Sequence, residues 1–136
     1  MTGNVGSVLK IAAAVVSDPD GRLLLVRKHN TSFYMQPGGK IDAGESALEA
    51  LCRELQEELG LHVSEDQLMP LGMYSVPAAN EPGVMLEAHL FGLVIDEPVD
   101  VDAAAEIAEA KWVTREEAWQ LPLAPLTKEY VAVKHT

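Results

Sequence analysis

The segment from Ala47 to Leu59 constrains the fold of this chain more than any other, because its start, its length and its end all specify a helix. Ser46 has the side chain of an N-cap, and Glu49 three residues later completes a capping box. Gly60 follows directly and is a natural residue at the C-terminal end of a helix. The sequence therefore predicts one long helix at mid-chain, beginning after Ser46 and ending before Gly60.

This helix has two faces of different character. At about 100° per residue, the leucines form a stripe that predicts core packing, made of Leu48, Leu51, Leu55 and Leu59. An adjacent face carries three carboxylates, those of Glu54, Glu57 and Glu58. Like charges at this spacing repel one another, and they lie toward the end of the helix where the macrodipole disfavours negative charge. The acidic face therefore has two interpretations, a solvated surface or a site for cations.

The loop before the helix favours the cation site. Gly38 and Gly39 permit a close approach of the backbone, and Asp42 and Glu45 add two further carboxylates. Carbonyl and carboxylate oxygens are the ligands that Mg²⁺ and Mn²⁺ prefer, and these hard cations bridge to substrate phosphates. We see no Lys or Arg group that would compensate the carboxylates, which predicts that the chemistry depends on a divalent cation.

Residues 39–61 read GKIDAGESALEALCRELQEELGL, which resembles the Nudix box, G-x5-E-x7-R-E-U-x-E-E-x-G-U with U an apolar residue. The residues at the fixed positions are Gly39, Glu45, Arg53, Glu54, Glu57, Glu58 and Gly60, with Leu55 and Leu61 at the apolar places. Every fixed position matches, so the signal is specific although the box covers only 23 of the 136 residues. The resemblance implies cleavage of a nucleoside diphosphate linked to another moiety, X.

The resemblance also implies an α+β fold, a Nudix-like α/β/α sandwich with a mixed β-sheet and one main catalytic helix. No linker or repeat divides the sequence, so residues 1–136 are expected to form a single Nudix hydrolase domain. The expected strands are Val8–Val16, Leu23–Arg27, Met69–Val76, Val84–Ile95 and Ala110–Val113. Two further helices are expected, one opened by Thr114 and one at Thr127–Val133. Residues 36–39 are expected to be irregular, because they hold a proline and paired glycines.

Roles for the residues of the box follow from the same resemblance. The implied ligands of the cofactor, Mg²⁺ or Mn²⁺, are Glu54, Glu57, Glu58, the Gly39 carbonyl and Glu45. Glu45 has a second interpretation, in which it braces the junction between the loop and the helix. Arg53 lies next to these ligands, and in the family this residue orients a carboxylate.

Catalysis would consist of water attack at phosphorus, with a carboxylate taking the proton of the water. Many relatives supply an additional Glu from a later loop, and Glu106, six residues before Trp112, resembles it. The general base stays open among Glu54, Glu57 and Glu106. The implied catalytic residues are therefore Glu54, Glu57, Arg53 and Glu106, with Glu109, Glu87 and Glu81 as weaker alternatives to Glu106.

Substrate-binding residues are expected at and before the start of the box. Lys40 joins Gly38 and Gly39 in this set. Phe33 and Tyr34 precede them and carry rings on which a base can stack, although core packing is the commoner use of such rings.

Two features indicate different substrates. Pro77, 16 residues beyond Leu61, resembles the proline marker of ADP-ribose-cleaving relatives and joins the expected substrate-binding residues. The run Gln36–Ile41 instead resembles the small branch that cleaves nucleoside triphosphates. We therefore expect Mg²⁺-dependent hydrolysis of a (deoxy)nucleoside triphosphate or similar small nucleotide, with an ADP-ribose or nucleotide-sugar pyrophosphatase as the alternative. A catalytically inactive Nudix-fold nucleotide-binding module and an acidic cation buffer are alternatives of another class.

Charge limits the partners of the chain. Its 10 Lys and Arg stand against 21 Asp and Glu, a formal net charge of −11. This charge disfavours nucleic acid polymers and acidic membranes, and leaves a small-molecule nucleotide screened by divalent cations as the expected partner. The single cysteine, Cys52, allows no internal disulfide, and no targeting or membrane segment is evident, so a cytoplasmic location is expected. The sequence leaves open whether the chain forms a homodimer.

Overall fold

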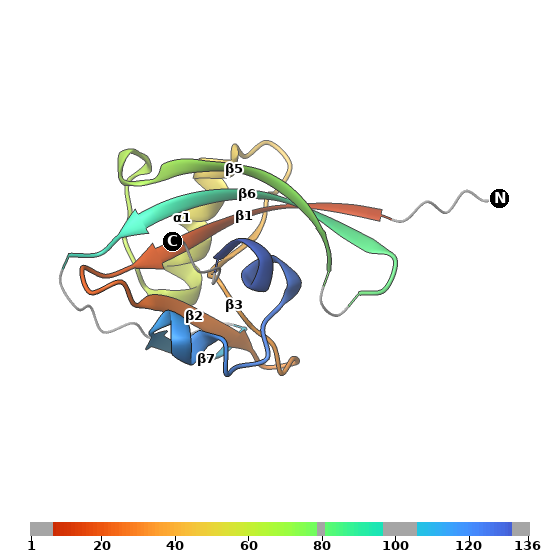
Figure 1. Cartoon of the computed structure of the whole chain (residues 1–136). Coiled ribbons are helices and arrows are strands. Elements are labelled where there is room, and N and C mark those ends of the chain that lie inside the picture. Colours follow the sequence, from red (N-terminus) through yellow and green to blue (C-terminus); the bar gives the residue numbers. More distant parts are fainter. Residues whose placement is uncertain (1–6, 79–80, 97–105, 132–136) are drawn as a thin grey trace.

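The computed structural model describes residues 7–78, 81–96 and 106–131 (Figure 1). The strands are β1 (Ser7–Ser17), β2 (Leu23–Lys28), β3 (Tyr34–Met35), β4 (Gly38–Lys40), β5 (Met69–Pro77), β6 (Val84–Val94) and β7 (Ile107–Val113). The helices are α1 (Ala47–Leu59), the 3₁₀ turn η1 (Glu65–Gln67), α2 (Arg115–Ala118) and the π-helical turn η2 (Thr127–Val131). In the part of the chain that the structure describes, no helix is long and apolar enough to span a bilayer.

The strands form one mixed sheet. Five of them lie side by side in the order β3-β2-β1-β6-β5, while β4 pairs with β1 and β7 pairs with β2. The strands β1 and β6 run parallel over their full length, from the pair Ser7 and Val84 to the pair Ser17 and Val94. The other paired strands are antiparallel. The mixed sheet expected from the sequence is therefore confirmed.

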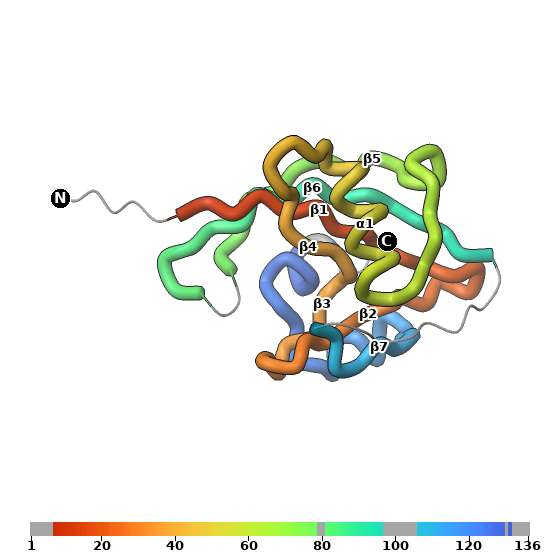
Figure 2. Tube along the Cα trace, turned by 180° about the vertical axis from the view of Figure 1, so that it is seen from behind, coloured from red at the N-terminus to blue at the C-terminus, as the bar shows by residue number. Residues whose placement is uncertain are grey.

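The central strands are apolar on both faces because both faces of the sheet are covered. Successive side chains of a strand point to opposite faces. On β1, Ala12 and Ala14 pack in the same cluster as the buried leucines of α1, whereas Ala13 packs in another cluster with Leu126 of the C-terminal segment. Figures 1 and 2 show α1 on one side of the sheet and the C-terminal segment with η2 on the other. This layering is the expected α/β/α sandwich.

Helix α1 begins and ends where the sequence predicts. The Ser46 side chain accepts a hydrogen bond from the Glu49 backbone N–H at 3.1 Å, and the Glu49 carboxylate accepts one from the Ser46 N–H at 2.8 Å. Gly60 ends the helix in the left-handed conformation, with φ of 68°. Leu51 and Leu55 are fully buried between the helix and the sheet. The box is thus held rigidly against β1 and β4.

The structure differs from the expectation at residues 36–39. These residues are not all irregular, because Gly38–Lys40 forms strand β4 and pairs with Ile11–Ala13 of β1. A strand this short has no side-chain pattern of its own, so only its partner strand defines it. The strand β7 begins at Ile107, earlier than expected, and the short strand β3 was not expected. The helical turn expected at Thr127–Val133 is present over its first five residues, and the last two lie outside the described residues.

Candidate active site

A cavity of about 450 Å³ lies where β1, β4, α1 and the C-terminal segment meet. Its wall includes apolar side chains from the face of β1 that is turned away from α1, among them Ile11 and Ala13. Six residues that the sequence assigns to the site also line it, namely Gly38, Gly39, Lys40, Glu54, Pro77 and Glu106. Apolar walls with a few polar groups at one end are typical of sites for small molecules.

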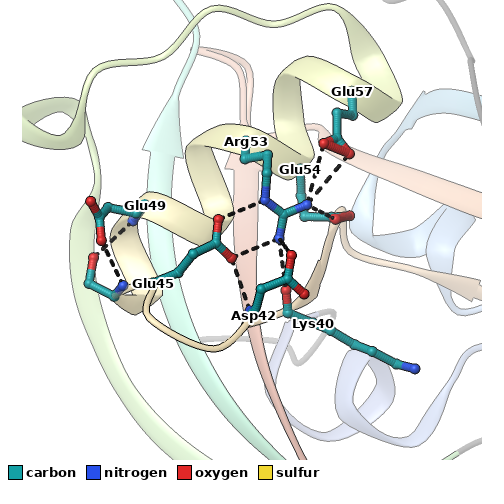
Figure 3. A network of polar contacts seen from close by, with 8 residues as sticks. Lys40, Asp42, Glu45, Glu49, Arg53, Glu54 and Glu57 are labelled. Atoms are coloured by element: carbon teal, nitrogen blue, oxygen red, sulfur yellow. Dashed lines mark hydrogen bonds and ion pairs between the residues drawn. The ribbon is translucent and has the colours of Figure 1, made fainter.

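Arg53 is the centre of a polar network that connects α1 to the loop before it (Figure 3). Its Nε donates to Glu45 Oε2 at 2.7 Å and its Nη2 to Glu45 Oε1 at 2.9 Å, a two-pronged contact that only a guanidinium can make. Nη2 also donates to the Lys40 carbonyl at 3.1 Å. Nη1 donates to Glu54 Oε1 at 2.8 Å and lies 3.4 Å from Glu57 Oε1. Arg53 therefore positions carboxylates and does not line the cavity.

This network corrects one expectation from the sequence. The carboxylates of the box do have a compensating cation, because Arg53 forms ion pairs with Asp42, Glu45, Glu54 and Glu57. The spacing of residues along a helix gives the face on which Arg53 lies but not the direction in which its guanidinium extends. A dependence on a divalent cation cannot be argued from an absence of positive charge.

Glu45 braces the junction between the loop and the helix. Both of its carboxylate oxygens accept hydrogen bonds from Arg53, and Oε1 also accepts one from the Asp42 backbone N–H at 2.9 Å. The side-chain hydrogen bonds from Arg53 lower the pKa of Glu45 to about 2, with a further contribution from the Asp42 N–H. Of its two interpretations, this geometry fits bracing, since both oxygens are already in use.

Glu54 reaches the cavity from α1. Burial raises the pKa of its carboxyl group, and the charge of Glu57 adds to this, while Arg53 opposes it. Gly39 lies so close that a Cβ at this position would collide with the Glu54 Oε2 atom. The backbone of β4 and the Glu54 carboxylate therefore approach as closely as a glycine allows.

Glu58 is more deeply buried and is not among the residues that line the cavity. The residue is 4% exposed, and its Oε1 atom has no hydrogen-bond partner among the described residues. Burial, with a smaller contribution from the charge of Glu54, raises the pKa of Glu58 to about 7. A buried carboxylate oxygen without a partner is unfavourable, so this atom favours either protonation of the carboxyl group or a cation beside it.

Glu57 and Glu106 lie nearer to solvent than Glu54 and Glu58. The Glu57 side chain is 54% exposed and lies against Arg53. The Glu106 side chain lines the cavity and is 3.8 Å from Lys28 Nζ. Glu106 also contributes to the raised pKa of Glu58, so its charge acts on the interior carboxylate. The segment carrying Glu106 is joined to β2 by a hydrogen bond from the His29 N–H to the Glu106 carbonyl at 3.0 Å.

Four of the remaining sequence candidates lie elsewhere or contribute to other contacts. Tyr34 lines a separate shallow groove, where its hydroxyl donates to Glu109 at 2.7 Å. Phe33 is not among the residues that line the cavity. The Glu109 carboxylate thus accepts a hydrogen bond from Tyr34 in that groove and does not line the cavity. Glu87 lies beside His89 on β6. Glu81 does line the cavity, on the side of Pro77.

The cavity region also contains residues that the sequence did not assign to the site, among them Lys28, Gln36 and Thr127. Lys28 lines the cavity at the end of β2, and its charge acts on both Glu54 and Glu58. Gln36 also lines it, and Thr127 bonds to Gln36 from behind. The position of Lys28 at the end of a buried strand was the only feature of the sequence that pointed to a role for this residue in the site. Nothing local in the sequence connects Gln36 with a residue so far along the chain.

The chemistry of this site fits a hard cation, although no metal cluster is formed as it stands. Within the described ranges, no three His, Cys, Asp or Glu side chains are arranged to enclose a metal ion. Two observations nevertheless fit such an ion beside Glu54 and Glu58. Glu58 has an unpartnered buried oxygen, and the Glu54 carboxylate lies so close to the β4 backbone that an added Cβ at Gly39 would meet it. Carboxylate and carbonyl oxygens of this kind are the donors that Mg²⁺ and Mn²⁺ bind.

Comparisons with known proteins find relatives that match most of this chain. The CTP pyrophosphohydrolase of Escherichia coli is 30% identical over 122 residues, which cover 87% of this chain and 84% of that protein. The putative 8-oxo-dGTP diphosphatase of Bacillus subtilis is 32% identical over 103 residues, 76% of this chain. The solution structure of the E. coli ORF135 protein superposes with a TM-score of 0.67 and 27% identity, covering 92% of this chain and 86% of that one.

The similarity covers most of this chain, but this chain covers only part of the length of some relatives. The chain spans 64% of the length of the B. subtilis diphosphatase. The family model described as the NUDIX domain matches residues 9–133, which include the sheet except the first two residues of β1, α1 and every residue of the cavity described above. The intact box, the layered fold and this match establish that the chain belongs to the NUDIX domain family.

Proposed function

We propose that this chain hydrolyses a pyrophosphate bond of a (deoxy)nucleoside triphosphate or a similar small nucleotide, with Mg²⁺ or Mn²⁺ as cofactor. Membership of the NUDIX family supports hydrolysis of pyrophosphate bonds, as do relatives that are named CTP pyrophosphohydrolase and 8-oxo-dGTP diphosphatase. The observation that carries the proposal is the pair Glu54 and Glu58, in which a carboxylate lining the cavity stands beside a buried carboxylate with an unpartnered oxygen.

The metal ligands in this proposal are Glu54, Glu57, Glu58 and the Gly39 carbonyl. A divalent cation, when bound, neutralises the phosphates and stabilises the charge that develops on them. Arg53 positions Glu54 and Glu57 through its hydrogen bonds and holds the Lys40 carbonyl in place. Glu45 acts through Arg53, so we assign it to positioning and not to binding the metal.

The chain's own residues supply the rest of the reaction. The water oxygen forms a bond to phosphorus, the bridging phosphorus–oxygen bond breaks, and a carboxylate takes the proton of the water. Among the three candidates for this base, Glu54 and Glu106 line the cavity and Glu57 does not. Lys28 and Lys40 also line it and place positive charge where the phosphates of the substrate would lie. We therefore propose Glu54 or Glu106 as the base.

A panel of nucleotides tests this proposal. The chain is incubated with nucleoside triphosphates and Mg²⁺, and the products are identified by mass. The expected products are nucleoside monophosphate and pyrophosphate, and excess EDTA is expected to abolish their formation. Full activity in EDTA would contradict the cation requirement. Tight nucleotide binding without any product would instead identify the chain as a binding module.

ADP-ribose is the second candidate substrate, and one observation favours it. Pro77, which resembles the marker of ADP-ribose-cleaving relatives, lines the cavity. Its replacement by Ala is expected to alter the ranking among substrates without abolishing turnover, because pocket contacts outside the shared phosphate site determine which group fits. Formation of AMP and ribose 5-phosphate from ADP-ribose, with a much higher kcat/KM than any triphosphate gives, would favour this second candidate.

A further inference from the structure

The pairing of β7 with β2 shifts by one residue where β2 reaches the cavity. Up to Arg27 the two strands pair residue for residue, and Arg27 lies opposite Glu109. The next pair joins Lys28, which lines the cavity, to Ile107. Ala108 therefore has no opposite residue on β2, which makes it the extra residue of a β-bulge. A bulge of this kind changes the direction of the side chains that lie beyond it.

The burial of β7 side chains shows the effect of this bulge. Ala110 and Trp112 pack in the same core cluster as the leucines of α1, as alternate residues of one strand should. Ile107 packs in this cluster too, although in an unbroken strand it would point to the opposite face. The residues beyond Ala108 are therefore turned by one position. Glu106, which lines the cavity, comes directly after this change and depends on it for its place.

The Glu106 side chain itself has weak contacts with the described residues. It is 74% exposed and lies 3.8 Å from Lys28 Nζ, and an exposed ion pair at this distance holds a side chain only loosely. The backbone of Glu106 is held better, because its carbonyl accepts a hydrogen bond from the His29 N–H at 3.0 Å. The place of the Glu106 carboxylate is therefore determined by the backbone that carries it, and so by the pairing of β7 with β2.

Three side chains fix β7 next to the bulge. Glu109 Oε1 accepts hydrogen bonds from the Tyr34 hydroxyl at 2.7 Å and from Arg27 Nε at 3.3 Å. The Tyr34 hydrogen bond, with smaller contributions from Arg27 and Lys111, lowers the pKa of Glu109, so this carboxylate is charged at neutral pH. Charge-assisted hydrogen bonds are the stronger ones in proteins. We call Arg27, Tyr34 and Glu109 the β7 clamp.

The β7 clamp is anchored in turn and lies outside the cavity. The Tyr34 N–H donates to the Pro122 carbonyl at 2.8 Å, and the Ala124 N–H donates to the Tyr34 carbonyl at 3.0 Å. Arg27 Nη1 donates to the Thr31 carbonyl at 3.2 Å. None of the three clamp residues is among those that line the cavity. The clamp can therefore act on the reaction through β7, without touching a molecule in the cavity.

We propose that the β7 clamp holds Glu106 in position to take the proton of the attacking water. This inference rests on the proposed function and assigns the base to Glu106. The other candidate, Glu54, accepts a hydrogen bond from Arg53 and is a proposed metal ligand, and both contacts oppose protonation of its carboxylate. In the step itself the water oxygen bonds to phosphorus, the bridging phosphorus–oxygen bond breaks, and the proton passes to a Glu106 carboxylate oxygen. Tyr34 and Arg27 are positioning residues in this step.

The test measures kcat and KM with GTP and with CTP in the presence of Mg²⁺. Tyr34→Phe removes the hydroxyl and keeps the ring, and is expected to lower kcat about tenfold with little change in KM. In a Glu106→Gln background, which already lacks the base, the same change is expected to lower kcat by less than about twofold. Equal losses of kcat in the two backgrounds would overturn the proposal, as would a normal kcat in Glu106→Gln alone.

Further variants separate positioning from general support of the fold. Glu109→Gln keeps an acceptor for the Tyr34 hydroxyl and is expected to retain a higher kcat than Glu109→Ala, which keeps none. Arg27→Lys is expected to lower kcat with little change in KM, and it tests the clamp if Tyr34→Phe does not fold. Tyr74→Phe removes a hydroxyl that donates to the Leu71 carbonyl at 2.9 Å and is expected to leave kcat unaltered. Equal kcat values for Glu109→Gln and Glu109→Ala would contradict the role of the clamp.

A measurement without turnover keeps this proposal separable from the hydrolytic one. Without nucleotide, the His29 N–H, which donates to the Glu106 carbonyl, is expected to exchange with deuterium about tenfold faster in Tyr34→Phe than in the unaltered chain. The Gly60 N–H at the end of α1 is expected to exchange equally fast in both. If no triphosphate is hydrolysed but His29 behaves as expected, the proposed function fails and the anchoring of Glu106 stands. If exchange at His29 does not change, the role of the clamp fails whatever the activity.

Discussion

Two neighbouring glycines of β4 differ in what an added side chain would meet. At Gly38 a Cβ would collide with the Ala12 carbonyl oxygen, which is backbone and cannot move, and the φ angle of 146° is one that other residues rarely adopt. At Gly39 a Cβ would meet the end of the Glu54 side chain, which can move. Substitution at the first position therefore strains the fold, and substitution at the second displaces the Glu54 carboxylate.

We predict opposite outcomes for alanine at these two positions. Gly39→Ala is expected to leave the melting temperature nearly unchanged but to reduce kcat strongly, because it displaces the Glu54 carboxylate. Gly38→Ala is expected to lower the free energy of unfolding by at least about 1–3 kcal/mol, the usual range for a residue held in such a conformation. Thermal unfolding and steady-state kinetics on both variants test this. A Gly39→Ala variant with normal kcat would place the Glu54 carboxylate outside the reaction.

A second prediction at the scale of residues concerns pH. Burial raises the pKa of Glu58 to about 7, so in the cation-free protein folding favours the protonated carboxyl. The stability contributed by this proton is fully present below the pKa of the unfolded chain and is lost as pH rises toward 7. We therefore expect Glu58→Gln to become more stable relative to the unaltered chain as pH rises from about 5 to 8, measured by thermal unfolding in EDTA.

Two measurements control this pH prediction. Glu116→Gln removes a carboxylate from an exposed position of α2 and is expected to show no such trend. At pH 8, added Mg²⁺ is expected to stabilise the unaltered chain more than Glu58→Gln, because a bound cation compensates the buried charge. If the difference in melting temperature between the unaltered chain and Glu58→Gln did not vary with pH, the raised pKa of Glu58 would be wrong.

At the scale of elements, α1 and β4 are connected through Glu45 and Arg53. Arg53→Lys keeps the positive charge but loses the planar fork that contacts both Glu45 oxygens. We expect Arg53→Lys and Glu45→Gln each to lower kcat about tenfold or more with little change in KM, since they displace Glu54 and not the substrate. The double variant is expected to lose little more than either single one, because all three break the same connection.

The ion pair of Asp18 and Arg22 provides a control for the Arg53→Lys prediction. Their side chains are 2.6 Å apart in the turn between β1 and β2, away from the cavity. Arg22→Lys makes the same chemical change and is expected to leave kcat unaltered. If the losses from Arg53→Lys and Glu45→Gln instead multiplied in the double variant, the two residues would act independently of each other.

What the sequence predicted at this scale depended on how local the signal was. The limits of α1 followed from Ser46, Glu49 and Gly60, which lie within one turn of the ends of the helix. The strand β4 was missed because its three residues are a strand only through pairing with Ile11–Ala13. The contact of Gln36 with Thr127 joins residues 91 positions apart, and no local pattern encodes it. The orientation of Arg53 was missed for a similar reason, since a helical period gives the direction of a Cβ and not of a guanidinium.

At the scale of the whole molecule, the net charge of −11 opposes an anionic substrate. Salt screens this long-range repulsion, and the Debye length is about 10 Å at 0.1 M ionic strength. With free Mg²⁺ held constant, we expect kcat/KM to rise when NaCl increases from about 10 to about 100 mM. A fall over this range, measured with GTP and CTP, would show that the nearby lysines outweigh the net charge.

The parallel pairing of β1 with β6 has a consequence for the order in which the chain is made. Ser7 pairs with Val84, so the first described strand finds this neighbour only after α1, β4 and β5 have left the ribosome. Closing so long a loop is slow, and parallel pairs gain nothing until both strands are present. The acidic helix is therefore synthesised before the sheet that buries its leucines is complete. The strands β1 and β4, against which this helix packs, have by then been made, so the late arrival of β6 determines when the layer that covers the helix is completed.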